Sequence, residues 1–512
     1  MTVKQTDCRR FECQSARVPC YGWPSVADDV AEMFGQMERV EKVVIVVFDA
    51  LRPDMIAGRM PVLETFLGDN LWFRNATSVF PSLTRVCSAS VSTGAWPGRH
   101  GIVNNEFHLN DDLGGPMVNT AKLDHLLALK ERTGAIVTAD SLGQRLAAAG
   151  RSMMAIHCGS AGSGLLVNHA VREVGQRTFS IHGAGATLTP EIVAEVLATC
   201  GPLPAQEVPK LDVVAYAGRV ATEVALAQDQ ADVTLVWLPE PDTSFHFCGI
   251  HSEGATQAMA AADTVFADIL DAVATGPHAS STAVIAMSDH GQIATSALVD
   301  LTGLLRADGF RAGEAPGDDT GILLTGGNWG ELRPVSPDPG LIADLGRWLM
   351  GRDEIGMVFA DPGLVTGALP LSSVHQTHAR SAPLAYVMRS HVTPGPGDIP
   401  GIGVYTGGVP LGGGMHGGLN RYEMNITLAV AAPEARRGEI DLGPASLIDI
   451  APSVLSLFGL DGDTDGRVLP LFETEQETAT TETLRAGSGG FEQQLVRVKL
   501  AGRDYLIEGG RV

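Results

Sequence analysis

Residues 43–49 read VVIVVFD, a continuous run of β-branched and aromatic residues that ends in an aspartate. A run without polar alternation is typical of a strand whose two faces are both covered, as in a parallel sheet. Similar runs recur as SMMAIH (152–157), DVTLVWL (232–238), TAVIAM (282–287) and NITLAVAA (425–432). We therefore expect an α/β fold in which helices sandwich a central, largely parallel sheet.

Segments with helical periodicity lie between these runs. DSLGQRLAAAG (140–150) begins with two N-cap candidates, an aspartate and a serine, and it ends at a glycine that can stop a helix. EGATQAMAAADTVFADILDAVATG (253–276) has a long amphipathic pattern. SLIDIAPSVLSLFGL (446–460) fits a helix that tolerates Pro452 in its first turn. This alternation of strands and helices supports the α/β prediction.

The sequence predicts three parts along the chain. Residues 1–40 are polar and irregular, and we expect an N-terminal extension there. Residues 41–470 contain the apolar runs and form the main domain, in which the less regular stretch 294–400 is expected to be an inserted cap that shapes access to a site. Residues 471–512 begin as a charged linker, FETEQETATTETLRAGSGG, and then alternate like a β-hairpin turned at Ala501-Gly502.

Composition limits the classes of function. A chain of 512 residues with 45% hydrophobic content can bury a large core. The formal net charge of -23 leaves no excess of Lys and Arg to neutralise phosphates, so the protein does not coat nucleic acid. The same charge repels anionic small molecules at long range. An anionic substrate would therefore have to be attracted locally, for instance by metal ions.

Cysteine usage and hydropathy bear on the compartment. The seven cysteines lack CxxC spacing, and we expect reduced thiols, with the first three at the surface: Cys8, Cys13, Cys20, Cys87, Cys158, Cys200 and Cys248. The first 20 residues lack the apolar core of a signal peptide, and no run reaches the about 20 apolar residues that span a bilayer. These features predict a cytoplasmic protein without a membrane segment. A homo-oligomer is compatible with the sequence.

Aspartates and histidines follow several of the expected strands. Asp49 ends the first run, Asp242 and His246 follow the third in EPDTSFHFCG, and Asp289 and His290 follow the fourth. Because the carboxyl ends of parallel strands meet along one edge of a sheet, these residues can share one crevice. Mixed histidine and carboxylate ligands suit zinc or a similar transition metal. The pattern predicts a metal site at that edge.

Two further segments add to this set. His416 is flanked by glycines in GGGMHGGLN, and Thr84 lies in FPSLTRV. Seven such groups are enough to hold two metal ions with a hydroxyl between them. A threonine hydroxyl bound to a divalent cation loses its proton more readily, so we predict Thr84 as a nucleophile at the start of a helix; Ser82 and Ser88 are weaker candidates. Taken singly, Asp49 and Thr84 could also be helix caps, and the histidines could be ordinary ones.

Five motifs in one order, between about residue 43 and about residue 459, resemble the alkaline phosphatase superfamily, and most closely its nucleotide pyrophosphatase/phosphodiesterase branch. They include PSLTR, STGAWPGRHGIVNNEF and EPDTSFHFCG. The resemblance implies a two-metal phosphoesterase with a phosphothreonine intermediate and two divalent ions, with Zn²⁺ expected. It also implies that Asn105 donates to a non-bridging phosphoryl oxygen. The implied metal ligands are Asp49, Thr84, Asp289 and His290 for one ion and Asp242, His246 and His416 for the other.

The chain departs from this branch at Arg85, where relatives usually carry an apolar or aromatic residue that helps to hold the leaving group. Arg85 could clamp an extra phosphate or carboxylate, or it could point to solvent. We expect the neighbouring Asn104 to be a turn residue. The remaining histidines of interest have no such motif and are expected to be structural or cap residues: His100, His251, His375 and His378.

The substrate is therefore expected to be a small phosphate ester or phosphonate, most simply a phosphodiester or nucleotide pyrophosphate. Three alternatives stay open. The first is a C–P bond hydrolase similar to phosphonoacetate hydrolase, with Arg85 on the carboxylate. The second is a phosphomonoesterase. The third is a non-catalytic metal- or anion-binding relative, which the retention of every implied ligand disfavours.

Overall fold

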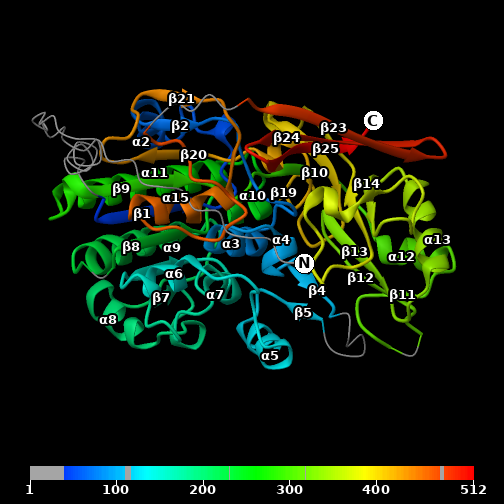
Figure 1. Cartoon of the computed structure of the whole chain (residues 1–512), viewed down its shortest axis with the longest axis horizontal. Helices are drawn as coiled ribbons and strands as arrows, with labels where there is room; N and C mark the ends of the chain where they lie inside the picture. Colours follow the sequence, from blue (N-terminus) through cyan, green and yellow to red (C-terminus); the bar gives the residue numbers. More distant parts are fainter. Residues whose placement is uncertain (1–39, 110–116, 230, 318, 473–477) are drawn as a thin grey trace, which may run out of the picture. The chain divides into compact units, whose positions relative to one another are not determined.

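The run VVIVVF lies in strand β1 (Lys42–Phe48), inside the main sheet of a computed structural model (Figure 1). The structure describes residues 40–109, 117–229, 231–317, 319–472 and 478–512. Within these ranges the main sheet has eight strands. Their spatial order is β21 (Glu439–Asp441), β2 (Leu71–Phe73), β20 (Leu428–Ala431), β9 (Thr282–Met287), β1, β8 (Val233–Leu238), β6 (Met153–His157) and β7 (Arg177–Ser180).

Most strands of this sheet are parallel. β9, β1, β8, β6 and β7 run in one direction, and Val43 on β1 pairs in register with Val233 on β8. Only β20 is antiparallel to the neighbours on both of its sides, β9 and β2. Leu428 at the start of β20 pairs with Met287 at the end of β9. The chain that leads into β20 therefore reaches the same edge at which β1, β8 and β9 end.

Both faces of the sheet are buried, as the uninterrupted apolar runs predict. Alternate β1 residues belong to two separate cores: Val43, Ile45 and Val47 to one and Val44, Val46 and Phe48 to the other. The first face is covered by α3 (Thr84–Thr93), α5 (Leu123–Thr133), α6 (Leu142–Ala148), α7 (Ala161–Val167) and α15 (Ile450–Leu457). The second is covered by α2 (Pro61–Asp69), α8 (Glu191–Cys200), α9 (Leu211–Arg219) and α11 (Glu253–Thr275). The predicted sandwich is confirmed.

The three helices predicted from the sequence form. Ser141 caps α6 and makes a reciprocal capping box with Gln144. α11 is capped by Ser252, whose hydroxyl accepts from the amide of Ala255. α15 contains Pro452 in its first turn. At the N-termini of α6 and α11, serine side-chain oxygens satisfy amides that have no partner inside the helix.

Among the described residues of 294–400, where the sequence predicts an inserted cap, there are several strands and two α-helices. One sheet has the order β11 (Ala312–Gly313), β12 (Ile322–Thr325), β13 (Trp329–Pro334), β16 (Leu384–Met388), β14 (Ile355–Ala360) and β15 (Leu369–Pro370). Another has the order β17 (Ser390–Pro394), β18 (Pro400–Tyr405), β10 (Ile293–Leu298) and β19 (Gly414–Met415). The helices are α12 (Leu301–Ala307) and α13 (Pro339–Met350). The stretch is thus more regular than its sequence pattern indicates.

The C-terminal residues form a three-stranded antiparallel sheet of β23 (Thr480–Ser488), β24 (Phe491–Leu500) and β25 (Arg503–Arg511). The hairpin between β24 and β25 is confirmed, and Ala501 and Gly502 turn it with positive φ angles of 51° and 75°. The linker prediction is wrong for residues 480–488, because this stretch pairs with β24 along its whole length. Its threonines are β-branched and suit a strand, and Glu482 forms ion pairs with Arg497 and Lys499 on β24.

The remaining α-helices and strands are short. They are α4 (Pro97–His100), α10 (Asp242–Cys248), α14 (Arg421–Met424) and the strand pairs β3 (Ala76–Thr77) with β22 (Ala445–Ser446) and β4 (Glu106–Phe107) with β5 (Val118–Asn119). Residues 1–39, with Cys8, Cys13 and Cys20, lie outside the described residues. The other four cysteines are free, and only Cys248 among them is exposed. In the described ranges no helix combines the length and apolarity needed to cross a bilayer.

Candidate metal centre and active site

Four of the predicted site residues converge on one atom. Asp49 follows β1, Asp289 and His290 follow β9, and Thr84 is the first residue of α3. Nε2 of His290 lies 3.1 Å from the Thr84 hydroxyl, 3.2 Å from Asp289 Oδ2 and 3.5 Å from Asp49 Oδ1. The carboxyl edge of the sheet thus brings together residues as far apart in the sequence as Asp49 and His290.

Each carboxylate of Asp49 and Asp289 has one oxygen that accepts hydrogen bonds and one that accepts none from the described residues. Oδ2 of Asp49 accepts from the indole N–H of Trp237 at 3.0 Å. Oδ1 of Asp289 accepts from the amides of Ala50 at 3.1 Å and His290 at 3.0 Å. The other oxygens, Asp49 Oδ1 and Asp289 Oδ2, are buried and have no hydrogen-bond partner among the described residues. These two oxygens are the ones that face His290 Nε2.

This arrangement fits a divalent metal ion. Ligand atoms bound to a tetrahedral ion at about 2.0–2.2 Å lie about 3.3 Å from one another, which matches the spacing around His290 Nε2. Burial, together with repulsion between the two carboxylates, raises the pKa of Asp49 well above its ordinary value. Burial also raises the pKa of Asp289 to about 8. Two buried, repelling carboxylates need a cation to compensate them.

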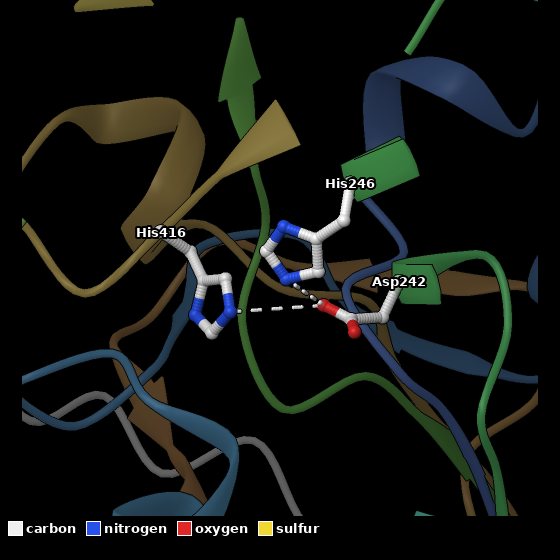
Figure 2. Close-up of side chains that lie close together, drawn as sticks. All are labelled: Asp242, His246 and His416. Atoms are coloured by element: carbon white, nitrogen blue, oxygen red, sulfur yellow. Dashed lines mark ion pairs between the residues drawn. The ribbon is translucent and has the colours of Figure 1, made fainter. Parts of the chain in front are cut away.

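A second cluster lies beside the first. Asp242 is the first residue of α10, and His246 follows one helical turn later. Figure 2 shows that both His246 and His416 point toward Asp242: their Nε2 atoms lie 3.2 Å and 3.7 Å from its Oδ1. The ligand atoms of these three residues all lie within 4.8 Å of one another, and so do those of Asp49, Asp242 and His290. Asp242, predicted for the second ion alone, is therefore within reach of both positions.

The three histidines are oriented by backbone carbonyls. Nδ1 of His246 lies 2.7 Å from Gly414 O, Nδ1 of His416 lies 2.7 Å from Ser82 O, and Nδ1 of His290 lies 3.2 Å from its neighbour's carbonyl. In the tautomer that donates from Nδ1 to these carbonyls, Nε2 carries the lone pair and faces the carboxylates. Metal-binding histidines commonly have this arrangement.

A pocket of about 440 Å³ opens over the two clusters. The predicted residues Thr84, Arg85, Asn105, Asp242, His246 and His416 line it, whereas Asp49, Asp289 and His290 are buried and do not. Another wall comes from residues 324–329, which run from the end of β12 to the start of β13, and from residues 405–407 at the end of β18. Part of the 294–400 stretch therefore shapes the pocket.

Arg85 faces this pocket rather than solvent alone. It is partly buried, and its Nε donates to the hydroxyl of Thr120 at 3.0 Å. Burial lowers the pKa of Arg85 to about 10, so the guanidinium stays charged at neutral pH. The sequence leaves open whether Arg85 points into the pocket or to solvent, and in the structure it lines the pocket.

The weaker nucleophile candidates have other roles. The Ser82 hydroxyl is buried, donates to Gly418 O at 3.0 Å and accepts from the amide of Gly417 at 3.1 Å. The Ser88 hydroxyl donates to the carbonyl of Thr84 at 2.7 Å. Both hydroxyls are engaged with the backbone. Of the three candidates, Thr84 is the one that both lines the pocket and faces the cluster of Asp49, Asp289 and His290.

Asn104, predicted as a turn residue, lies in a bend, and its side chain also makes tertiary contacts. Its side chain is buried, accepts from the amide of Asn105 at 2.7 Å and donates to Thr325 and Glu331 at 3.3 Å and 3.4 Å. Asn104 thus connects the Asn105 backbone to β12 and β13. The histidines expected to be structural do not line the pocket; His100, for example, pairs with the Ser90 hydroxyl at 2.9 Å.

Comparisons with known structures show a shared fold. The chain is similar to murine ectonucleotide pyrophosphatase/phosphodiesterase 5, with a TM-score of 0.57, 16% identity and coverage of 83% of this chain and 97% of that chain. The human ectonucleotide pyrophosphatase/phosphodiesterase 5 gives a TM-score of 0.58, 16% identity and the same coverage. An inactive threonine-to-alanine variant of the murine protein, in complex with AMP, gives a TM-score of 0.57, 17% identity and the same coverage.

Sequence comparison assigns the family. No curated protein sequence matches the chain significantly. The family model described as type I phosphodiesterase/nucleotide pyrophosphatase matches residues 43–337, more than half of the chain. The matched region includes the Thr84 segment and the strands that precede Asp49, Asp242 and Asp289. The chain belongs to the type I phosphodiesterase/nucleotide pyrophosphatase family, in the alkaline phosphatase superfamily.

Proposed function

We propose that this protein hydrolyses phosphodiesters and nucleotide pyrophosphates through a phosphothreonine intermediate on Thr84, with two divalent metal ions. The observation that carries the proposal is the position of the Thr84 hydroxyl: it lines the pocket and lies 3.1 Å from His290 Nε2, beside two buried carboxylate oxygens that lack partners. Zn²⁺ is the proposed metal because the ligands combine imidazole and carboxylate groups.

The proposed ligands divide into two sets, one for each ion. One set comprises Asp49, Asp289, His290 and Thr84, and the other comprises Asp242, His246 and His416, with Asp242 within reach of both. When bound there, divalent cations would make the Thr84 hydroxyl more acidic and would stabilise negative charge on the leaving oxygen. The phosphoryl group would lie in the pocket above these residues.

The chain's own residues supply the other parts of the chemistry. Thr84 Oγ1, after losing its proton, forms a bond to phosphorus while the bond to the leaving oxygen breaks. Water then attacks the phosphothreonine, releases the phosphate product and restores the Thr84 hydroxyl. Thr84 begins α3, whose first amides have no partner inside the helix and suit an anionic group. Asn105 lines the same pocket and can donate a neutral hydrogen bond to a phosphoryl oxygen.

The structural neighbours support both the residue type and the substrate class. The murine neighbour bound to AMP is an inactive threonine-to-alanine variant, which agrees with a functional threonine on this fold and with a nucleotide ligand. A second candidate function, cleavage of a C–P bond in a phosphonoacetate-like substrate, is favoured by Arg85, because its guanidinium lines the pocket and can bind a carboxylate.

The proposal is tested with metal-depleted protein that is reloaded with Zn²⁺. Substrates are bis-p-nitrophenyl phosphate, p-nitrophenyl phosphate, a nucleotide pyrophosphate and phosphonoacetate. We expect about two ions per chain by elemental analysis, loss of activity on chelation, and the highest kcat/KM on the diester or pyrophosphate. An active preparation free of divalent metal would contradict the two-metal proposal, and a preference for phosphonoacetate would favour the second candidate.

The Thr84→Ala variant is the matched control in the same experiment. It keeps the six Asp and His ligands, so it should retain most of its metal while turnover falls by about 10³-fold or more. Thr84→Ser keeps a hydroxyl and should retain part of the activity. Acid quenching during turnover should trap a phosphorylated chain in the wild type and none in Thr84→Ala. Near wild-type rates in Thr84→Ala would remove the nucleophile assignment.

A further inference from the structure

Arg85 is a cation in the pocket that has no carboxylate partner among the described residues. Among the described residues that line the pocket, it is the only Arg or Lys. No carboxylate oxygen of the described residues lies within 4.0 Å of its guanidinium. Glu106, whose charge acts on it most strongly, accepts a hydrogen bond from the side chain of Asn119 instead. The free donors of this partly buried guanidinium can therefore be satisfied by water or by acceptors of a ligand in the pocket.

Thr120 holds this guanidinium in place. It follows β5 and is fully buried. Its hydroxyl donates to the carbonyl of Asn105 at 2.7 Å and accepts from Arg85 Nε at 3.0 Å. Its amide donates to the same carbonyl at 2.9 Å. Thr120 thus ties Arg85 to the segment that carries Asn105. Within the described part of the chain, no hydrogen bond engages the two terminal nitrogens of the guanidinium.

The position of Arg85 in the chain places it next to the proposed reaction. It directly follows Thr84 in α3, and both line the same pocket. The planar fork of a guanidinium matches the two oxygens of a carboxylate or a phosphate, and such charge-assisted pairs are strong. Glu106 and Glu314 also line the pocket, so an anionic substituent is expected to bind at Arg85 rather than elsewhere on the wall.

We infer that Arg85 forms a subsite for a second anionic group, a carboxylate or a phosphate, close to the phosphoryl group that Thr84 attacks, and that Thr120 is the positioning residue of this subsite. The inference rests on the proposed function for the place of the phosphoryl group. It narrows the substrates to phosphate or phosphonate compounds that carry a further anionic group near the scissile bond, and it separates them from simple diesters.

The kinetic test uses three diesters with one leaving group: ethyl, carboxymethyl and phosphonomethyl p-nitrophenyl phosphate. Arg85→Ala should lower kcat/KM for the two charged substrates by about 10- to 100-fold more than for the ethyl ester. Arg85→Lys keeps the positive charge but loses the planar fork of donors. Its preference for the charged substrates should lie between those of the wild type and Arg85→Ala. Preference for the carboxylate or for the phosphonate in the wild type identifies the natural type of anion.

Thr120 has its own matched pair of variants. Thr120→Val keeps the shape of the side chain but removes the hydroxyl, so it should reduce the preference for charged substrates as Arg85→Ala does. Thr120→Ser keeps the hydroxyl and should keep the preference. A purely structural role for Thr120 would lower all three kcat/KM values equally and leave their ratios unchanged. That result would overturn the positioning role.

Binding without turnover separates this inference from the proposed function. Calorimetric titration of Zn²⁺-loaded protein with methylphosphonate, phosphonoacetate and methylenediphosphonate measures the effect of the second anionic group directly. The last two should bind at least about 10-fold more tightly than methylphosphonate in the wild type, and Arg85→Ala should remove the difference. If diesters are not hydrolysed but this binding pattern is found, only the proposed function fails. If Arg85→Ala leaves the pattern unchanged, the subsite is wrong.

Discussion

Ser82 connects the nucleophile segment to the loop that carries His416. Its carbonyl faces Nδ1 of His416 at 2.7 Å, and its hydroxyl is bonded to Gly417 and Gly418. Ser82→Ala would leave the Gly417 amide buried and unpaired, which costs about 1–3 kcal/mol. We predict a loss of this size in the free energy of unfolding, together with weaker Zn²⁺ binding in chelator competition.

The control for this prediction is Ser336→Ala, since Ser336 is exposed. It should match the wild type in both the unfolding and the chelator measurements. If Ser82→Ala also matched the wild type, the hydroxyl would not hold the His416 loop. The backbone carbonyl of Ser82 would then be sufficient to orient the imidazole.

The metal ligands and the positioning residues differ in how well the sequence predicts them. Asp49 and Asp289 follow apolar runs, and a charged residue directly after a buried strand is a local signal that can be seen in the sequence. Ser82, Asn104 and Thr120 have no such signal. Ser82 bonds to a carbonyl 336 positions away, and Asn104 to a hydroxyl 221 positions away. Their roles depend on tertiary contacts that spacing does not encode.

At the scale of elements, the start of α15 is held by Asp449. Its buried carboxylate accepts from the amides of Ser446 at 2.9 Å and Arg467 at 2.8 Å, and it lies 3.4 Å from the Tyr505 hydroxyl on β25. Burial raises the pKa of Asp449 to about 6. Between about pH 4 and pH 6 the folded chain therefore keeps a proton that the unfolded chain has lost, so stability falls as pH rises through this range.

Asp449→Asn removes this titration. We predict that its free energy of unfolding falls less steeply with rising pH between about 4 and 6, with a difference from the wild type of up to roughly 3 kcal/mol across the range. The exposed Asp461→Asn serves as the control and should follow the wild-type slope. Denaturant unfolding at several pH values measures the free energy of unfolding of each protein. If it changed with pH equally in the wild type and in Asp449→Asn, the raised pKa of Asp449 would be contradicted.

Elements with a strong internal pattern are the ones that the sequence predicts. β1, β9 and α11 carry apolar runs or helical periodicity that need no knowledge of their neighbours. β23 does not, because its polar residues become a strand only through pairing with β24 and the ion pairs of Glu482. The antiparallel direction of β20 is likewise invisible in its apolar run. Pairing partners, rather than propensity, decide these two cases.

At the scale of the whole molecule, the C-terminal sheet is part of the main core, whereas the sequence predicts only a linker and a hairpin after the main domain. Leu495 on β24 and Leu506 on β25 are fully buried within the same core as Val43 and Ile45 of β1. The side chain of Gln493 accepts a hydrogen bond from the amide of Val358 on β14 and donates one to its carbonyl. Figure 1 shows the C-terminal sheet beside β14. The amide of Gly509 donates to Leu419 O at 2.8 Å, in the loop after His416.

These contacts predict that the C-terminal sheet and the main sheet unfold together. Leu495→Ala should lower the free energy of unfolding by about 2–5 kcal/mol, because it leaves a cavity in the shared core, whereas Val512→Ala, at a residue 65% exposed, should change it by less than about 0.5 kcal/mol. Fluorescence of the buried Trp237 and Trp329 reports on the main sheet and on β13. One cooperative transition at a lower denaturant midpoint is expected in Leu495→Ala. The opposite result would be a fluorescence transition at the wild-type midpoint, with a separate loss of the far-ultraviolet circular dichroism of the C-terminal strands. In that case the C-terminal sheet would unfold independently, and the hydrogen bond from Gly509 to Leu419 would not contribute to the site.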